Sequence, residues 1–268
     1  MRARNIGLIL GIGILGMVLA SCGTTEPTEE LPAPQVEYTV QDTGKSVLLT
    51  WDAITGAAGY KVECDGSVIA ELADSVTTYK VNGEEHVCKN ITVYAVDDNG
   101  NEGASQTIDF TMKEFSLRLY RSDDPVNPSW AKIDFTNYIV DALTQGDVDP
   151  DASNTGYFIY YYDSNLDWRV FKDASETEGV GQAKVVMKFT NDTQDILAPS
   201  TGYETITENV DAGERYIFWA DDVDAGLGAI SENDNFGVIR VDNVNDDSLW
   251  VDITIYIQTE EYLRWVKE

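Results

Sequence analysis

Strand-length apolar runs, broken by turn residues, constrain the fold of this chain more than any other feature of its sequence. Val47, Leu49 and Trp51 occupy alternate positions, so in a strand their side chains point to one face. The same two-residue period recurs over 60–64 and 91–95, and each of these two runs leads into Asp, Asn or Gly. Turn signals about every eight to twelve residues predict a β-sandwich over 34–112.

Residues 114–268 contain a second set of strand-like runs. They are rich in β-branched and aromatic residues and are separated by Asp, Asn and Gly, which suit turns. The expected strands are 115–121, 131–139, 156–162, 168–171, 183–190, 215–220, 236–241 and 249–257. The chain is therefore expected to be all-β, with a second, larger β-sandwich or jelly-roll domain over 114–268. Its tail is expected to close with a short helix, with Thr259 as the N-cap.

The first thirty residues belong to neither sandwich. Two arginines within the first four residues precede a wholly apolar run over 6–20, and no acid occurs before Glu26. This order is typical of an export signal. Leu19-Ala20-Ser21-Cys22 follows, and it resembles the lipobox of bacterial lipoproteins. The resemblance implies a signal peptide over 1–21, with cleavage before Cys22 and lipid on its thiol and amine.

A membrane anchor of this kind has consequences for location. An uncleaved transmembrane helix is the alternative, but the apolar run would span roughly 22 Å of a hydrocarbon core of about 30 Å. Several acyl chains would hold the mature chain firmly, since one chain binds only marginally. Gly23 replaces the aspartate that retains enteric lipoproteins at the inner membrane, which favours the outer membrane or cell surface. Residues 22–33, with their Thr, Glu and Pro, are expected to form a flexible tether.

Lipid on Cys22 would leave Cys64 and Cys88 as an even pair. Outside the cytoplasm such a pair oxidises more often than not, and we expect a disulfide. Closing a loop of this length stabilises a fold by about 3 kcal/mol in the chain-entropy model. Two buried free thiols are the alternative, because the sequence does not give the distance between the two Cα atoms.

Three features within 34–112 carry a further resemblance. Trp51, the strand GYKV at 59–62 with its Asp-Gly turn, and VYAVDDNGNEG at 93–103 are similar in order and spacing to a fibronectin type III domain. The resemblance implies a module that acts as a spacer or a binding platform. That family usually pins one corner with a tyrosine, and Lys89 stands about where it should be. A disulfide between Cys64 and Cys88 is our hypothesis for what replaces that pin.

Charge and composition exclude several classes of function. The formal net charge is −29, which disfavours binding to nucleic acids or anionic headgroups because these need a basic face. The only histidine, His86, lies in a polar turn, so residues 114–268 hold no Ser-His-Asp site, Cys-His site or His-ligated zinc. We expect no enzyme. A carboxylate-based polysaccharide hydrolase stays open, since any two of the 47 acids could pair.

Two groups of residues are candidates for binding. Asp147, Asp149 and Asp151 alternate in a turn and offer hard oxygen ligands for Ca²⁺, although an acidic solvent loop is the alternative. No other cofactor is expected. Trp130 and Trp168, each beside turn-like residues, and Tyr161 are candidates for exposed rings that stack on a glycan, although most aromatic residues of a sandwich lie in its core.

The sequence thus leaves three functions open. The first is a non-catalytic, lipid-anchored extracytoplasmic protein that presents its second sandwich to a glycan or an envelope protein. The second is a structural component of the envelope without a small ligand. The third is the hydrolase.

Overall fold

The computed structural model describes residues 30–124, 126–163, 168–177, 180, 183–190, 196–222 and 228–268. The expected signal peptide, Cys22 and most of the expected tether lie outside the described residues. Within them, no helix is long and apolar enough to cross a membrane.

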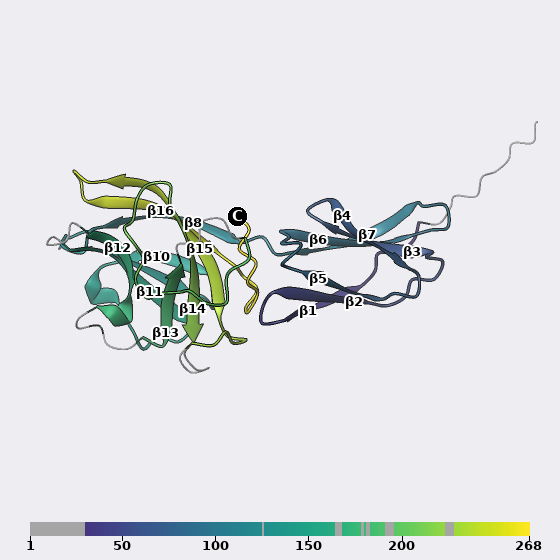
Figure 1. Ribbon diagram of the computed structural model, residues 1–268, viewed down its shortest axis with the longest axis horizontal. Helices are drawn as coiled ribbons and strands as arrows, with labels where there is room; N and C mark the ends of the chain where they lie inside the picture. The colour runs from purple at the N-terminus through teal and green to yellow at the C-terminus, as the bar shows by residue number, and fades with distance from the viewer. Residues whose placement is uncertain are drawn as a thin grey trace, which may run out of the picture. The chain divides into compact units, whose positions relative to one another are not determined.

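Residues 36–109 form two antiparallel sheets, seen as separate layers in Figure 1. One sheet has the order β1-β2-β5. The other has the order β4-β3-β6-β7. The strands are β1 (Val36–Gln41), β2 (Ser46–Trp51), β3 (Gly59–Cys64), β4 (Ser67–Ala73), β5 (Thr78–Asn82), β6 (Asn90–Val96) and β7 (Glu102–Asp109).

The core of this first sandwich confirms the alternation expected from the sequence. Val47, Leu49 and Trp51 are buried on one face of β2. Alternate residues of β3 and β6 meet them from the other sheet and join the same apolar cluster. Tyr60 packs its ring 5.3 Å from that of Trp51, centroid to centroid. Its hydroxyl accepts a hydrogen bond from the backbone N–H of Ile54 at 2.7 Å.

The expected disulfide is present. Cys64, the last residue of β3, is bonded to Cys88 with a Cα–Cα distance of 5.3 Å. Cys88 lies in the loop that leads into β6, and β6 pairs with β3. The bond therefore ties the end of one core strand to the entry of its neighbour.

Residues 113–257 form a second pair of antiparallel sheets. The larger sheet has the order β13-β14-β15-β16-β8, and these strands lie side by side in Figure 1. The smaller has the order β10-β9-β11-β12. The strands are β8 (Lys113–Tyr120), β9 (Trp130–Asp134), β10 (Ile139–Leu143), β11 (Thr155–Asp163), β12 (Trp168–Asp173), β13 (Val185–Thr190), β14 (Arg215–Asp222), β15 (Asn235–Asn245) and β16 (Trp250–Ile257).

The second pair is a sandwich rather than a jelly roll. One cluster of buried apolar side chains draws on both sheets, including Phe158 and Phe171 from one and Phe189 and Phe218 from the other. Most consecutive strands pair within one sheet instead of alternating between two, which a jelly roll requires. The nearly all-β fold expected from the sequence is confirmed.

Two expected elements are wrong. Residues 131–139 form not one strand but a hairpin, β9 and β10, because Asp134 turns the chain by accepting the backbone N–H of Thr136 and Asn137. The tail after Thr259 does not form a helix either. Its Tyr262 adopts a positive φ of 68°, which a helix cannot contain, and the chain continues extended to pair Trp265 with Leu197.

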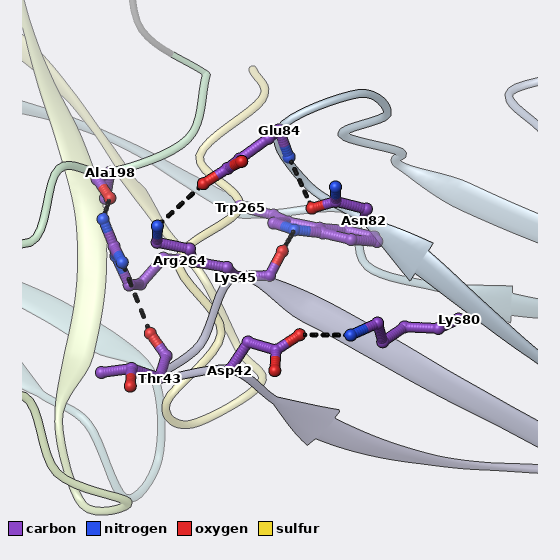
Figure 2. Close-up of polar contacts among 9 residues, drawn as sticks. All are labelled: Asp42, Thr43, Lys45, Lys80, Asn82, Glu84, Ala198, Arg264 and Trp265. Atoms are coloured by element: carbon purple, nitrogen blue, oxygen red, sulfur yellow. Dashed lines mark hydrogen bonds and ion pairs between the residues drawn. The ribbon is translucent and has the colours of Figure 1, made fainter.

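This extended tail belongs to the core of the first sandwich. Leu263 and Trp265 are buried in the same cluster as Val47 and Leu49. The indole Nε1 of Trp265 donates to the carbonyl oxygen of Lys45 at 2.9 Å, as Figure 2 shows. Leu263 and Trp265 thus complete a core whose other buried members lie about 150 to 230 positions earlier in the chain.

Glycine makes room for this tail. A Cβ at Gly83 would lie 2.4 Å from the Trp265 Nε1 and 2.3 Å from the carbonyl oxygen of Lys45. A Cβ at Gly44, where φ is +78°, would lie 2.0 Å from the carbonyl oxygen of Tyr262. Both positions therefore require a residue without a side chain.

Candidate functional site

The structure separates the three aromatic candidates. Trp130 is wrong as an exposed platform, because its side chain is fully buried. It packs beneath Leu143, Val148 and Ala152, which cover that face of the smaller sheet. Covering this face removes the indole from solvent.

Tyr161 is half-buried on the same sheet face and packs against the cluster around Trp130. The ammonium of Lys172 lies 4.7 Å from the centroid of its ring. One face of this ring is therefore occupied by a cation of the protein itself.

Trp168 is half-buried and lines an open hollow of about 360 Å³, which we call the Trp168 groove. It stands at the first position of β12, opposite Asp163 of β11. Tyr161, opposite Val170, lies on the same face but outside this lining. The lining residues are Trp168, Phe189, Thr190, Gly202 and the six residues 204–209.

A segment that the sequence did not mark as a strand builds the wall of the groove. Residues 205–210 run antiparallel to β12, with hydrogen bonds from Thr207 N to Phe171 O at 2.9 Å and from Val210 N to Arg169 O at 2.7 Å. Glu204 pairs on its other side with Phe189 of β13, at 2.7 and 2.8 Å. The segment thus connects the edge strands of the two sheets.

Polar side chains of this wall are held in place by the backbone of β12. The Oδ1 of Asn209 accepts the N–H of Arg169 at 3.0 Å. The Oγ1 of Thr207 accepts the N–H of Phe171 at 2.9 Å and donates to the carbonyl of Glu208. Thr207 is buried and both of these hydrogen bonds use its hydroxyl, so it holds the wall in place. The Trp168 indole beside the fixed amide of Asn209 is a suitable surface for a sugar, which offers an apolar face and many hydroxyls.

A buried carboxyl group supports the two edge strands below the groove. Asp173, at the end of β12, accepts the backbone N–H of Met187 in β13 at 2.7 Å and that of Ser175 at 2.8 Å. Burial raises the pKa of Asp173, although these hydrogen bonds oppose the shift. The side chain is fully enclosed, so its role is to hold β12 against β13.

The carboxylates expected to bind calcium do not converge. Asp147, Asp149 and Asp151 are all exposed. Asp147 accepts a hydrogen bond from the hydroxyl of Thr144, and Asp149 accepts the backbone N–H of Asp151. The described part of the chain contains no group of three or more His, Cys, Asp or Glu side chains that could hold a metal ion.

Two further hollows, each of about 480 Å³, adjoin each other where the tail meets the first sandwich. Both are lined by Lys45, Glu84, Ser200 and Arg264. The lysine is engaged with Glu84 at 2.8 Å. Arg264 is almost fully buried and donates to the carbonyl oxygens of Thr43 and Ala198. These contacts serve the docking of the tail.

Burial lowers the pKa of Arg264, and no carboxylate of the described residues lies within ion-pair distance of it. Its Nη1 and Nη2 instead donate to backbone carbonyls, which fix the tail to both of the segments it touches, whereas the buried Nε makes no hydrogen bond within the described residues. The sequence offered no sign of this role, because a lone arginine near a terminus is normally solvated.

No family model matches the chain, and no curated protein matches it. The fold defines an all-β protein of sandwich-like units, and the Trp168 groove is its candidate binding site.

Proposed function

We propose that this chain is a lipid-anchored, extracytoplasmic binding protein whose second sandwich binds a glycan in the Trp168 groove without turning it over. The groove carries the proposal, because it joins a half-exposed indole to the fixed amide of Asn209 in an open hollow. The anchor rests on the lipobox-like sequence ending at Cys22.

The first sandwich would act as a spacer in this proposal. Its three-stranded and four-stranded antiparallel sheets are compatible with the fibronectin type III resemblance of residues 34–112. Such modules commonly hold a neighbouring domain at a distance, although fold alone does not define function.

A glycan array with the full-length protein tests the binding proposal. We expect Trp168→Ala to weaken the best-bound glycan by about tenfold or more, because it removes the stacking surface. Trp250→Ala is the matched control, since Trp250 is also half-buried at the first position of its strand but lies outside the groove. Equal losses in both variants, or no bound glycan, would contradict the proposal.

The same glycan also tests for turnover. Because Glu204 and Glu208 both line the groove, a carboxylate-based hydrolase is the second candidate. Release of reducing sugar that stops in Glu204→Gln or Glu208→Gln would favour that candidate over a non-catalytic protein.

Metabolic labelling with palmitate tests the anchor. We expect the chain to incorporate the label and to sediment with membranes, and the Cys22→Ser variant to do neither. Labelling that persists in this variant would contradict lipid attachment at Cys22.

A further inference from the structure

The Trp168 groove is negatively charged. Glu204 and Glu208 are exposed and line it, whereas no lysine or arginine does so among the described residues. In that same part of the chain neither glutamate lies within 4.0 Å of a basic side chain. Two basic residues of β12 pair with this wall. The ammonium of Lys172 lies over the ring of Tyr161, and the guanidinium of Arg169 pairs with Asp211 and Asp246.

Acids beside aromatic rings are neutralised elsewhere in this sandwich. Asp252 binds the guanidinium of Arg118 through two hydrogen bonds, and that guanidinium lies 3.7 Å from the centroid of the Trp250 ring. Asp123 and Arg121 repeat the arrangement beside Tyr162. Each of these surfaces combines a ring, a cation and a carboxylate, whereas the lining of the groove, as far as the structure describes it, has the ring and the carboxylates without a cation.

We infer that the ligand supplies the missing cation: it is a glycan with free, protonated amino groups. This inference rests on the proposed function. An ammonium is attracted by the face of an indole, and it donates charge-assisted hydrogen bonds to carboxylates. Asn209 and Thr190, both partly exposed in the lining, offer polar groups for hydroxyls, which favours an amino sugar over a lysine side chain.

The general acidity of the chain requires a control. A protein with a net charge of −29 attracts any polycation weakly, whatever its surface. Glu114 is exposed on β8, at the opposite edge of the larger sheet from β13, so Glu114→Gln removes one charge without touching the groove.

The test compares two oligosaccharides of equal length, one of glucosamine and one of N-acetylglucosamine, by calorimetric titration of the full-length protein. At about pH 6 glutamates are ionised. We expect the glucosamine oligomer to bind about tenfold more tightly. Glu204→Gln and Glu208→Gln, singly and together, should reduce that preference, and Glu114→Gln should leave it unchanged. Raising the salt from about 50 to about 300 mM should also reduce it.

The outcomes separate this inference from the proposed function. Equal binding of both oligomers, lost in Trp168→Ala, would overturn the inference and retain the glycan site. If the preference for the glucosamine oligomer survives in the double variant, or falls equally in Glu114→Gln, the overall charge of the protein causes it and the inference is overturned. Oligolysine is titrated in the same way. If it binds more tightly than the glucosamine oligomer, and Trp168→Ala abolishes that binding, the ligand is a peptide and the proposed amino sugar is overturned. Absence of binding to both oligomers, together with an unresponsive glycan array, would overturn both proposals.

Discussion

At the scale of single residues, Asp65 shows how one side chain holds three segments together. It occupies a left-handed conformation with φ of 50° in the turn between β3 and β4. Its Oδ1 accepts the N–H groups of Lys89 and Asn90, both at 2.8 Å, and its Oδ2 binds the ammonium of Lys267 at 2.7 Å. It therefore connects the tail and the entry of β6 to this turn, at the corner where Lys89 stands in place of the expected tyrosine.

These contacts give Asp65 a defined pH dependence. Burial opposes its ionisation, but the hydrogen bonds from Lys267, Asn90 and Lys89 outweigh that effect and hold its pKa below the ordinary value. A carboxyl group with a lowered pKa in the folded state stabilises the protein above its ordinary pKa. That stability is lost as the pH falls through the folded value.

We therefore expect Asp65→Asn to lower the free energy of unfolding by about 1 to 2 kcal/mol at neutral pH. Asparagine tolerates the left-handed conformation, so the backbone of the turn is retained. Denaturant unfolding of both proteins at about pH 7 and about pH 3 measures the effect, which should shrink at the lower pH. The same difference at both values would refute the assigned role of the carboxylate.

At the scale of elements, the tail is held by packing that depends on glycine. We expect Gly83→Ala to destabilise the protein by about 2 to 3 kcal/mol, since its Cβ would collide with the Trp265 indole and with backbone. Gly146→Ala is the control, because a Cβ there meets nothing within 4 Å and its φ is not positive. Thermal unfolding of the two variants checks this, and equal midpoints would contradict the docking of the tail.

The disulfide between Cys64 and Cys88 also stabilises elements of the first sandwich, because it joins the end of β3 to the entry of β6. Reduction should lower the free energy of unfolding by about 3 kcal/mol, because the bond closes a loop with a sequence separation of 24 residues. Calorimetry with and without reductant measures the change. An unchanged midpoint would contradict our hypothesis that the disulfide stabilises the corner next to Lys89.

Elements with local signals were predictable from the sequence, and elements defined by distant partners were not. The alternation around Val47 identified β2, and the aromatic position of Trp168 identified one side of the groove. The other side, 204–209, becomes a wall only by pairing with β12 and β13, which lie far from it in sequence. The burial of Trp130 and the extended tail after Thr259 were misjudged for the same reason, since distant segments decide both.

At the scale of the whole molecule, Leu263 and Trp265 make the first sandwich dependent on the end of the chain. A core that needs residues from both ends of the described chain cannot unfold in one part alone without losing buried apolar surface. We expect one thermal transition for the full-length protein, measured by calorimetry, and a lower midpoint for Trp265→Ala. Two separate transitions would show that the tail does not couple the two sandwiches.

We propose that a glycan stacks on Trp168 beside Glu204 and Glu208. The most direct measurement is a crystal structure of the protein with the tightest ligand from the array. We expect a sugar ring against the Trp168 indole, with a ligand amine within hydrogen-bond distance of one of the two carboxylates. A ligand bound at Trp250 or in the hollows beside Arg264, with the Trp168 groove empty, would contradict it.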